Sequence, residues 1–353
     1  MRNVVVARDP AAARAAQSVV EDGANAVDMA VAGALAGAVR ASSSALLGGC
    51  GLLVVGTGMG RHWIDGRPRA PGLGEARRKT PETPPAHWGA AVPGFFPGLF
   101  SAHARFGSMP LTQLARAAAA AVKEEEGWKA LKPRLELMEA VSRQGLPGLE
   151  RTGVMRAVLS AVGPAAGGLF TEDDLVPAPA PIRELVPCCD EGFEVFTFPR
   201  SVPRWGGASP DPLPALGADA VVTCDKLGVF CAASWLVAPE GVALDGAPGI
   251  TLGDLLPLPR KGVARWKPGG SLPVPFALGV FAQSSNAFSA FALTGRGDLV
   301  RRADALLNAR LEASGSALRV GEGEAGAVWD AKALWVQRAL QGDRVIGDVV
   351  AVE

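Results

Sequence analysis

The sequence has no excess of either charge. Its 35 lysines and arginines are matched by 35 aspartates and glutamates, and charged residues make up 20% of the 353 positions. A protein that holds nucleic acid electrostatically needs a strongly basic face, so this composition argues against nucleic acid as a partner. We interpret the local basic run at residues 77–79 as a solvated loop.

The sequence has few histidines, and its cysteines lack the paired spacing of metal ligands. The histidines are His62, His87 and His103, and the five cysteines show no CxxC spacing. Metal centres usually draw on closely spaced His and Cys ligands, and an odd number of cysteines gives no disulfide framework. The sequence therefore predicts no metal site and no disulfide scaffold, and it points to no cofactor.

Apolar runs of membrane-spanning length are also missing. The stretch 30–39 is apolar but short, and it contains Gly33 and Gly37, whereas a spanning helix needs about 20 residues. The first residues reach Asp9 without the apolar core of a secretory signal. We therefore expect a soluble, cytoplasmic protein with no membrane partner.

Alanine, glycine and proline are abundant instead. The chain has 44 Gly and 28 Pro, and 48% of its residues are hydrophobic, which excludes a disordered chain. The glycines have no triplet period, which excludes collagen. The composition favours a folded protein with many tight turns and closely packed elements.

Two helices are predicted near the start of the chain. Asp9 is a plausible N-cap with Pro10 at the first helical position, and the helix should continue over 11–22. The alanine-rich stretch 26–39 predicts a second helix that packs closely against a sheet. We expect Asp28, in its first turn, to cap it.

The rest of the chain reads as strands joined in hairpins, with helices laid on them. Strands are predicted at 4–7, 52–55, 192–198, 220–223, 229–233, 276–283, 288–293 and 345–352, and further helices at 98–106, 111–126 and 299–311. Residues 68–93 are predicted to be a loop, and residues 177–187 are proline-rich. The order predicts an α+β layered fold rather than a regular βαβ repeat.

Several stretches resemble, in the right order, signature segments of the γ-glutamyltranspeptidase family, which are N-terminal-nucleophile (Ntn) hydrolases. They are GANAVDMAV at 23–31, SSALLGGC at 43–50, IDGRPRAP at 64–71, the segment from AVPG at 91–94 to Pro110, and GGLFTEDDL at 167–175. The resemblance implies that family's four-layer αββα sandwich. It also implies one domain over 1–353, with a large-subunit-like part (1–217) and a small-subunit-like part (218–353).

The resemblance places an alanine where the family has its catalytic threonine. The family's chain cleaves itself before that threonine, whose hydroxyl then attacks the substrate. The strand and turn that follow it are recognisable as VVTCDKLG at 221–228, which puts Ala218, Asp219 and Ala220 at the family's Thr-Thr-His. Ala218 has no hydroxyl, so the resemblance implies an unprocessed chain that is inactive in γ-glutamyl transfer and glutathione hydrolysis.

Groups that assist the threonine in the family are replaced as well. Leu236 stands where the family has a threonine that steadies the nucleophile, and Ala238 where it has an asparagine that holds the substrate's amino end. Leu258 takes the place of the family's substrate-binding aspartate, because Asp254 falls short of it. The resemblance therefore implies a site that has lost its orienting side chains.

The remaining parts of the family's site bind the substrate's α-carboxylate and form the oxyanion hole. The family's serine pair would fall near Ser271-Leu272, and its oxyanion-hole glycines near Ser285 and Asn286. Arg67 is retained at the position of the arginine that grips the substrate's α-carboxylate. Without its partners, Arg67 could instead cap a loop or make an ordinary surface ion pair.

These observations leave three functions open. The first is a pseudoenzyme that binds a small amino-acid or glutamyl ligand, or a partner protein. The second is an active amide hydrolase or transferase with another nucleophile, for which Thr223, Cys224 and Ser209 are the nearest candidates. Thr223 and Cys224 lie more than about 15 Å along the strand from the expected point of attack, at about 3.3 Å per residue. The third is a structural scaffold without a ligand.

Overall fold

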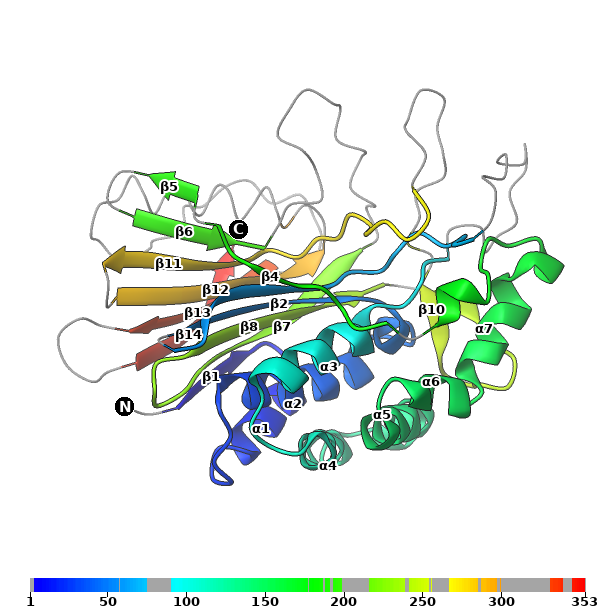
Figure 1. The fold of residues 1–353 in the computed structure, drawn as a ribbon. Coiled ribbons are helices and arrows are strands. Elements are labelled where there is room, and N and C mark those ends of the chain that lie inside the picture. Colours follow the sequence, from blue (N-terminus) through cyan, green and yellow to red (C-terminus); the bar gives the residue numbers. More distant parts are fainter. Residues whose placement is uncertain are drawn as a thin grey trace.

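The computed structural model describes residues 3–56, 58–74, 90–176, 178–186, 188–190, 193–198, 216–238, 241–253, 255, 267–284, 287–296, 299, 331–338 and 345–352. In this part of the chain no helix has the length and apolar character needed to cross a membrane. Helices and antiparallel strands form layers, as the sequence predicted (Figure 1).

A twelve-stranded, curled sheet is the centre of the fold. One half contains β4 (Ile182–Glu184), β3 (Gly60–Gly66), β2 (Cys50–Gly56), β8 (Phe230–Val237), β7 (Gly217–Cys224) and β1 (Val4–Ala7), in that order. The other half contains β5 (Cys188–Asp190), β6 (Phe193–Thr197), β11 (Leu278–Ser284), β12 (Ala287–Arg296), β13 (Ala331–Arg338) and β14 (Val345–Val352). A separate pair is formed by β9 (Gly241–Ala243) and β10 (Thr251–Gly253).

The two halves are joined where β12 reaches β7. Gly295 pairs with Ala218, and Arg296 pairs with Gly217. Earlier in β12, the residues from Ala287 to Ala292 pair with β11 instead. One long strand therefore takes part in both halves, and the sheet curls so that the two halves face each other.

The helices lie along the outer face of the half that contains β7 and β8 (Figure 1). They are α1 (Pro10–Ser18), α2 (Ala26–Ala41), α3 (Phe95–Phe106), α4 (Leu111–Lys123), α5 (Lys132–Gln144), α6 (Pro147–Arg151) and α7 (Val154–Val162). Short 3-10 turns occur at Ala45–Leu47, Trp128–Leu131, Pro164–Ala166 and Asp173–Leu175. Apart from Leu299, the helix predicted at 299–311 is outside the described residues.

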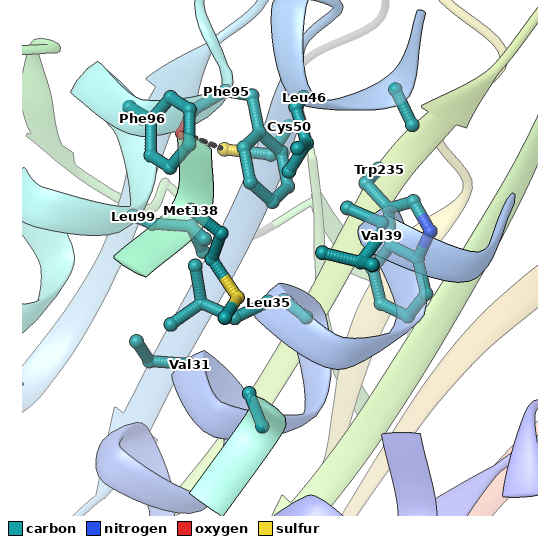
Figure 2. Close-up of a cluster of buried hydrophobic side chains, with 14 of the residues drawn as sticks. Val31, Leu35, Val39, Leu46, Cys50, Phe95, Phe96, Leu99, Met138 and Trp235 are labelled. Atoms are coloured by element: carbon teal, nitrogen blue, oxygen red, sulfur yellow. Dashed lines mark hydrogen bonds between the residues drawn. The ribbon is translucent and has the colours of Figure 1, made fainter. Parts of the chain in front are cut away.

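Two apolar cores hold the layers together. The first lies between the helices and the sheet, and α2 is buried from Ala26 to Val39 within it. Figure 2 shows part of this core, with Leu35 and Val39 of α2 among the labelled side chains, together with Phe95 and Trp235. The second core fills the space between the two sheet halves and contains Ala218 and Leu236. Because both faces of β7 and β8 are covered, these strands are mostly apolar, with Asp219, Thr223 and Ser234 as the polar exceptions.

The start of α2 is fixed by a capping box. The Asn25 side chain accepts hydrogen bonds from the N–H groups of Val27 and Asp28, and Asp28 accepts one from the N–H of Asn25. The buried Asp28 carboxylate also accepts from the N–H and hydroxyl of Ser108. The predicted capping role of Asp28 is confirmed, and it extends to the turn that precedes α4.

Several predicted boundaries were wrong by a few residues. The N-cap role of Asp9 is confirmed by its bond from Ala12, but α1 ends at Ser18 because the chain turns there toward Gly23, whose φ is +90°. Helix α3 begins at Phe95 and not at residue 98, since Pro97 is tolerated in a first turn. Strands β3, β4, β5, β9, β10 and β13 were not predicted, and β4 lies inside the proline-rich stretch 177–187.

Candidate functional site

Ala218 lies at the start of β7, between two neighbouring strands. Leu236 of β8 is its partner on one side and Gly295 of β12 on the other. Ala218 and Leu236 are 2% and 1% exposed, and both belong to the core between the sheet halves. The position that the resemblance assigns to a nucleophile therefore holds a methyl group in apolar surroundings.

Asp219 is on the opposite face of β7. Successive side chains of a strand alternate, and the next ones on its side, Val221 and Thr223, pack against the helices. Its Oδ1 accepts from the N–H of Ala220 over 2.9 Å. Burial, with a smaller contribution from the charge of Asp9, raises the pKa of Asp219 to about 6, although the bond from Ala220 opposes the rise. Asp219 thus faces the helical layer and is turned away from the position of Ala218.

The strand next to β7 supplies no polar group beside Ala218. Leu236 donates its N–H to the carbonyl of Gly49 over 3.0 Å, so its backbone is engaged. Ala238 is buried in the same core. The described part of β8 therefore has only alkyl side chains at the two positions where the family has threonine and asparagine.

Arg67 lies just after β3 and forms an ion pair with Asp65. Its Nε donates to Oδ1 over 2.7 Å, its Nη2 donates to Oδ2 over 2.8 Å, and its backbone N–H also reaches Oδ1. Ser271 donates its hydroxyl to Oδ2 of the same carboxylate over 3.1 Å. Burial raises the pKa of Asp65, but the hydrogen bonds and charge of Arg67 outweigh it and hold the pKa below its usual value.

Aromatic rings flank this ion pair. The Arg67 guanidinium carbon lies 5.9 Å from the ring centre of Trp63 and 5.8 Å from that of Phe198. Phe198 makes an edge contact with Phe276, with 5.9 Å between ring centres. The three rings belong to the core between the sheet halves, so Arg67 lies at the border of that core.

Glycines bring the segments around Arg67 into close contact. Gly49 lies against Pro68 and the carbonyl of Gly66, and a Cβ at Gly94 would collide with the carbonyls of Gly66 and Arg67. A path across the sheet therefore connects the two positions of interest. It runs from Ala218 to its partner Leu236, then to Gly49, and then to the segment that contains Arg67. With about 4.8 Å between neighbours, Arg67 and Ala218 belong to one region of the molecule.

The alternative nucleophiles have structural partners or lie outside the described residues. Thr223 is fully buried and donates to the carbonyl of Ala26 over 2.7 Å. Cys224 is also buried and, as predicted, shares the strand face of Ala218. Ser209 is outside the described part of the chain, as are Ser285, Asn286, Asp254 and Leu258.

Two residues near the site were not singled out from the sequence. Asp65 is the partner of Arg67, and the spacing Asp-x-Arg was the available signal. Ser234 lies on the same strand face as Leu236, fully buried, and donates its hydroxyl to the carbonyl of Asp219 over 3.0 Å.

Of the described histidines, His62 stacks on Phe106 and His103 bonds the carbonyl of Met109. The described residues contain no cluster of three or more His, Cys, Asp or Glu that could hold a metal ion.

The family comparison agrees with the signatures noted in the sequence. The family model described as Gamma-glutamyltranspeptidase matches residues 12–144. The resemblance to the γ-glutamyltranspeptidases is confirmed. The match includes the segments at 23–31, 43–50 and 64–71, and it therefore covers both Asp65 and Arg67. No curated protein matches the sequence.

Two solved structures align with this chain over nearly its whole length, and a third aligns with about half of it. Cephalosporin acylase from Bacillus halodurans aligns with a TM-score of 0.70 and 14% identity, over 100% of this chain and 96% of that one. A structure of LmbA2991 aligns with a TM-score of 0.65 and 16% identity, over 99% and 96%. The γ-glutamyltranspeptidase from Pseudomonas nitroreducens aligns over 55% and 70%, with a TM-score of 0.46 and 22% identity. The chain has the α+β fold of the Ntn hydrolases.

Proposed function

We propose that this chain is a γ-glutamyltranspeptidase-like protein that neither cleaves itself nor breaks amide bonds, and that binds a small carboxylate ligand at Arg67. The observation that carries the proposal is the pairing of Ala218 with Leu236 in an apolar core. An Ntn hydrolase needs a hydroxyl or thiol as its nucleophile, and a methyl group cannot act as one.

The surroundings of Ala218 support the loss of catalysis. When catalytic residues act together, removal of one of them costs the enzyme nearly all of its activity. In this chain the residue paired with Ala218 is Leu236, and the side chain of Asp219 is turned toward the helical layer. The leucine paired with Ala218 can neither take a proton from an attacking group nor stabilise a negative charge, and the nearby Ser234 hydroxyl is already bonded to the carbonyl of Asp219.

The ligand part of the proposal rests on Arg67. A guanidinium is the side chain best suited to a carboxylate, because its N–H groups match the two oxygens. Arg67 is partly exposed, it is held in place by Asp65, and it lies in the segment that matches the family. A small amino acid or a glutamyl compound such as glutathione has the carboxylate that this group would bind.

Activity and binding are tested on the same purified protein. We expect no colour from a chromogenic γ-glutamyl anilide, and heat on titration with glutamate, glutamine or glutathione in a calorimeter. Arg67→Ala should weaken binding about tenfold or more, and Arg67→Lys should weaken it as well, because lysine keeps the charge but not the fork. Hydrolysis of the anilide would overturn the first half of the proposal. The absence of heat with all three compounds at millimolar concentration would overturn the second.

A further inference from the structure

The contacts of Asp65 are unusually concentrated on one residue. Its carboxylate accepts from the backbone N–H, the Nε and the Nη2 of Arg67, over 3.2, 2.7 and 2.8 Å. Ser271 adds a bond to Oδ2 over 3.1 Å. Nearly the whole hydrogen-bonding capacity of a buried carboxylate is therefore spent on fixing one guanidinium and its backbone.

The chain segments that carry these residues are tied together by their backbones. Arg69 forms a bridge with Val92 and another with Ser271, and Leu272 donates its N–H to the carbonyl of Pro68 over 2.8 Å. Arg67 and Ser271 are consequently held next to each other by the main chain. Because this segment is already ordered, the hydroxyl of Ser271 can bind Asp65 without the entropy cost of ordering a loop.

The ion pair uses only one of the two forks of the guanidinium. Nε and Nη2 face Asp65, whereas none of the described residues accepts a hydrogen bond from Nη1, and the Arg67 side chain keeps 12% of its surface exposed. The rings of Trp63 and Phe198 limit its rotation. The fork made by Nη1 and the second hydrogen of Nη2 is therefore held in one direction, it has no acceptor among the described residues, and its geometry suits two oxygens of a ligand.

We infer that Asp65, supported by Ser271, is the positioning residue of Arg67 and leaves one fork of its guanidinium for a single, singly charged carboxylate. This inference rests on the proposed ligand binding and names the class of ligand. The ion pair is already neutral, so a ligand is held by directed hydrogen bonds more than by net charge. A doubly charged phosphate group would meet the charge of Asp65 across the guanidinium and is disfavoured.

Arginine-specific labelling of the full chain tests the positioning directly. Phenylglyoxal reacts with guanidinium groups, and peptide mass spectrometry gives the rate for each arginine. Asp65→Asn should speed the labelling of Arg67 about tenfold or more, because its charge-assisted bonds are lost. Ser271→Ala should raise the rate less. Arg183 is the matched control, since it also lies over the Trp63 ring, at 5.5 Å, and its rate should not change in either variant.

Ligand protection in the same assay tests the specificity. Glutamine should slow the labelling of Arg67 in the wild-type protein, whereas glutaminamide, which lacks the carboxylate, and inorganic phosphate should not. An unchanged Arg67 rate in a folded Asp65→Asn protein would overturn the positioning role. If that variant does not fold, the same result in Ser271→Ala would overturn it. Equal protection by phosphate or glutaminamide, or none by glutamine, would overturn the ligand class. Anilide hydrolysis would overturn the proposed lack of activity without affecting these readouts.

Discussion

Ala218 and Leu236 face each other across β7 and β8, each almost completely buried. In the γ-glutamyltranspeptidase family the resemblance places threonines at both positions. In this chain the two side chains belong to the core that holds the two sheet halves together. The stability of the fold and the proposed loss of chemistry depend on the same pair of residues.

Ala218→Thr should not restore self-cleavage. The change supplies a hydroxyl, but Leu236 and Ala238 still offer no group to activate it, and catalytic residues act as a unit. A hydroxyl in this apolar place should also lower the free energy of unfolding, by about 1–3 kcal/mol. Denaturing electrophoresis and a melting curve give both answers. Ala218→Val is the control, because valine has the shape of threonine without the hydroxyl; fragments from the threonine variant alone would contradict the prediction.

Asp28→Ala should destabilise the protein. Loss of the reciprocal cap costs about 0.5–2 kcal/mol, and the N–H of Ser108 also loses its acceptor. Chemical denaturation measures the change in the free energy of unfolding. Asp22→Ala, which removes one exposed hydrogen bond to Gln113, is the control and should have little effect. Equal midpoints for Asp28→Ala and the wild type would show that the capping box is unimportant.

Asp219 should make stability depend on pH. Its pKa of about 6 in the folded protein lies above the ordinary value of 3.8, so the folded state binds more protons than the unfolded state between these values. Stability should therefore fall as the pH rises from about 4 to about 6, and the penalty should persist above that range. Asp219→Asn removes the titration and should stabilise the protein more at pH 7 than at pH 4. Melting curves at both pH values test this, and an identical difference at the two would contradict it.

Gly37→Ala should be poorly tolerated. A Cβ at this position would overlap with the indole ring of Trp235, which is itself fully buried. Overpacking of this kind costs about 1–3 kcal/mol, more than the roughly 1 kcal/mol that alanine gains over glycine inside a helix. Gly33→Ala on the same helix is the comparison and should cost less, because its Cβ would meet the Ala12 carbonyl oxygen at 3.1 Å and the Val221 methyl groups at 3.3 Å, which is tight but short of overlap. Melting temperatures that do not differ between the two variants would contradict the close approach of α2 to β8.

The sequence predicted the elements whose signals are local. Asp9 with Pro10 marked the start of α1, and the alanine-rich run marked α2, because capping and helical periodicity act within a few residues. β3 was missed because GRHWIDG has glycine at both ends and charged residues within it, which is not the pattern of a buried strand. Its Asp65 is tolerated inside only because Arg67 and Ser271 neutralise and bind it.

The site was predicted in part. The family signatures singled out Arg67 and Ala218, and the structure has Ala218 near the start of β7, paired with Leu236 of β8, and Arg67 just after β3. The roles that the resemblance assigns to these residues stay predictions. The ion pair of Arg67 depends on which rotamer its side chain adopts and on Ser271, about 200 residues away along the chain. No local pattern reports such a contact. Ser234 faces the core between the sheet halves and Asp219 faces the helical layer, and neither direction can be predicted without the sheet register.

The intact mass of the purified chain tests the central claim most directly. After prolonged incubation at neutral pH, electrospray mass spectrometry should show a single species near 36.2 kDa, because Ala218 cannot attack the peptide bond that precedes it. Two fragments, the second of which begins at residue 218, would contradict the account, since they would require a self-cleaving site that the residues around Ala218 do not provide.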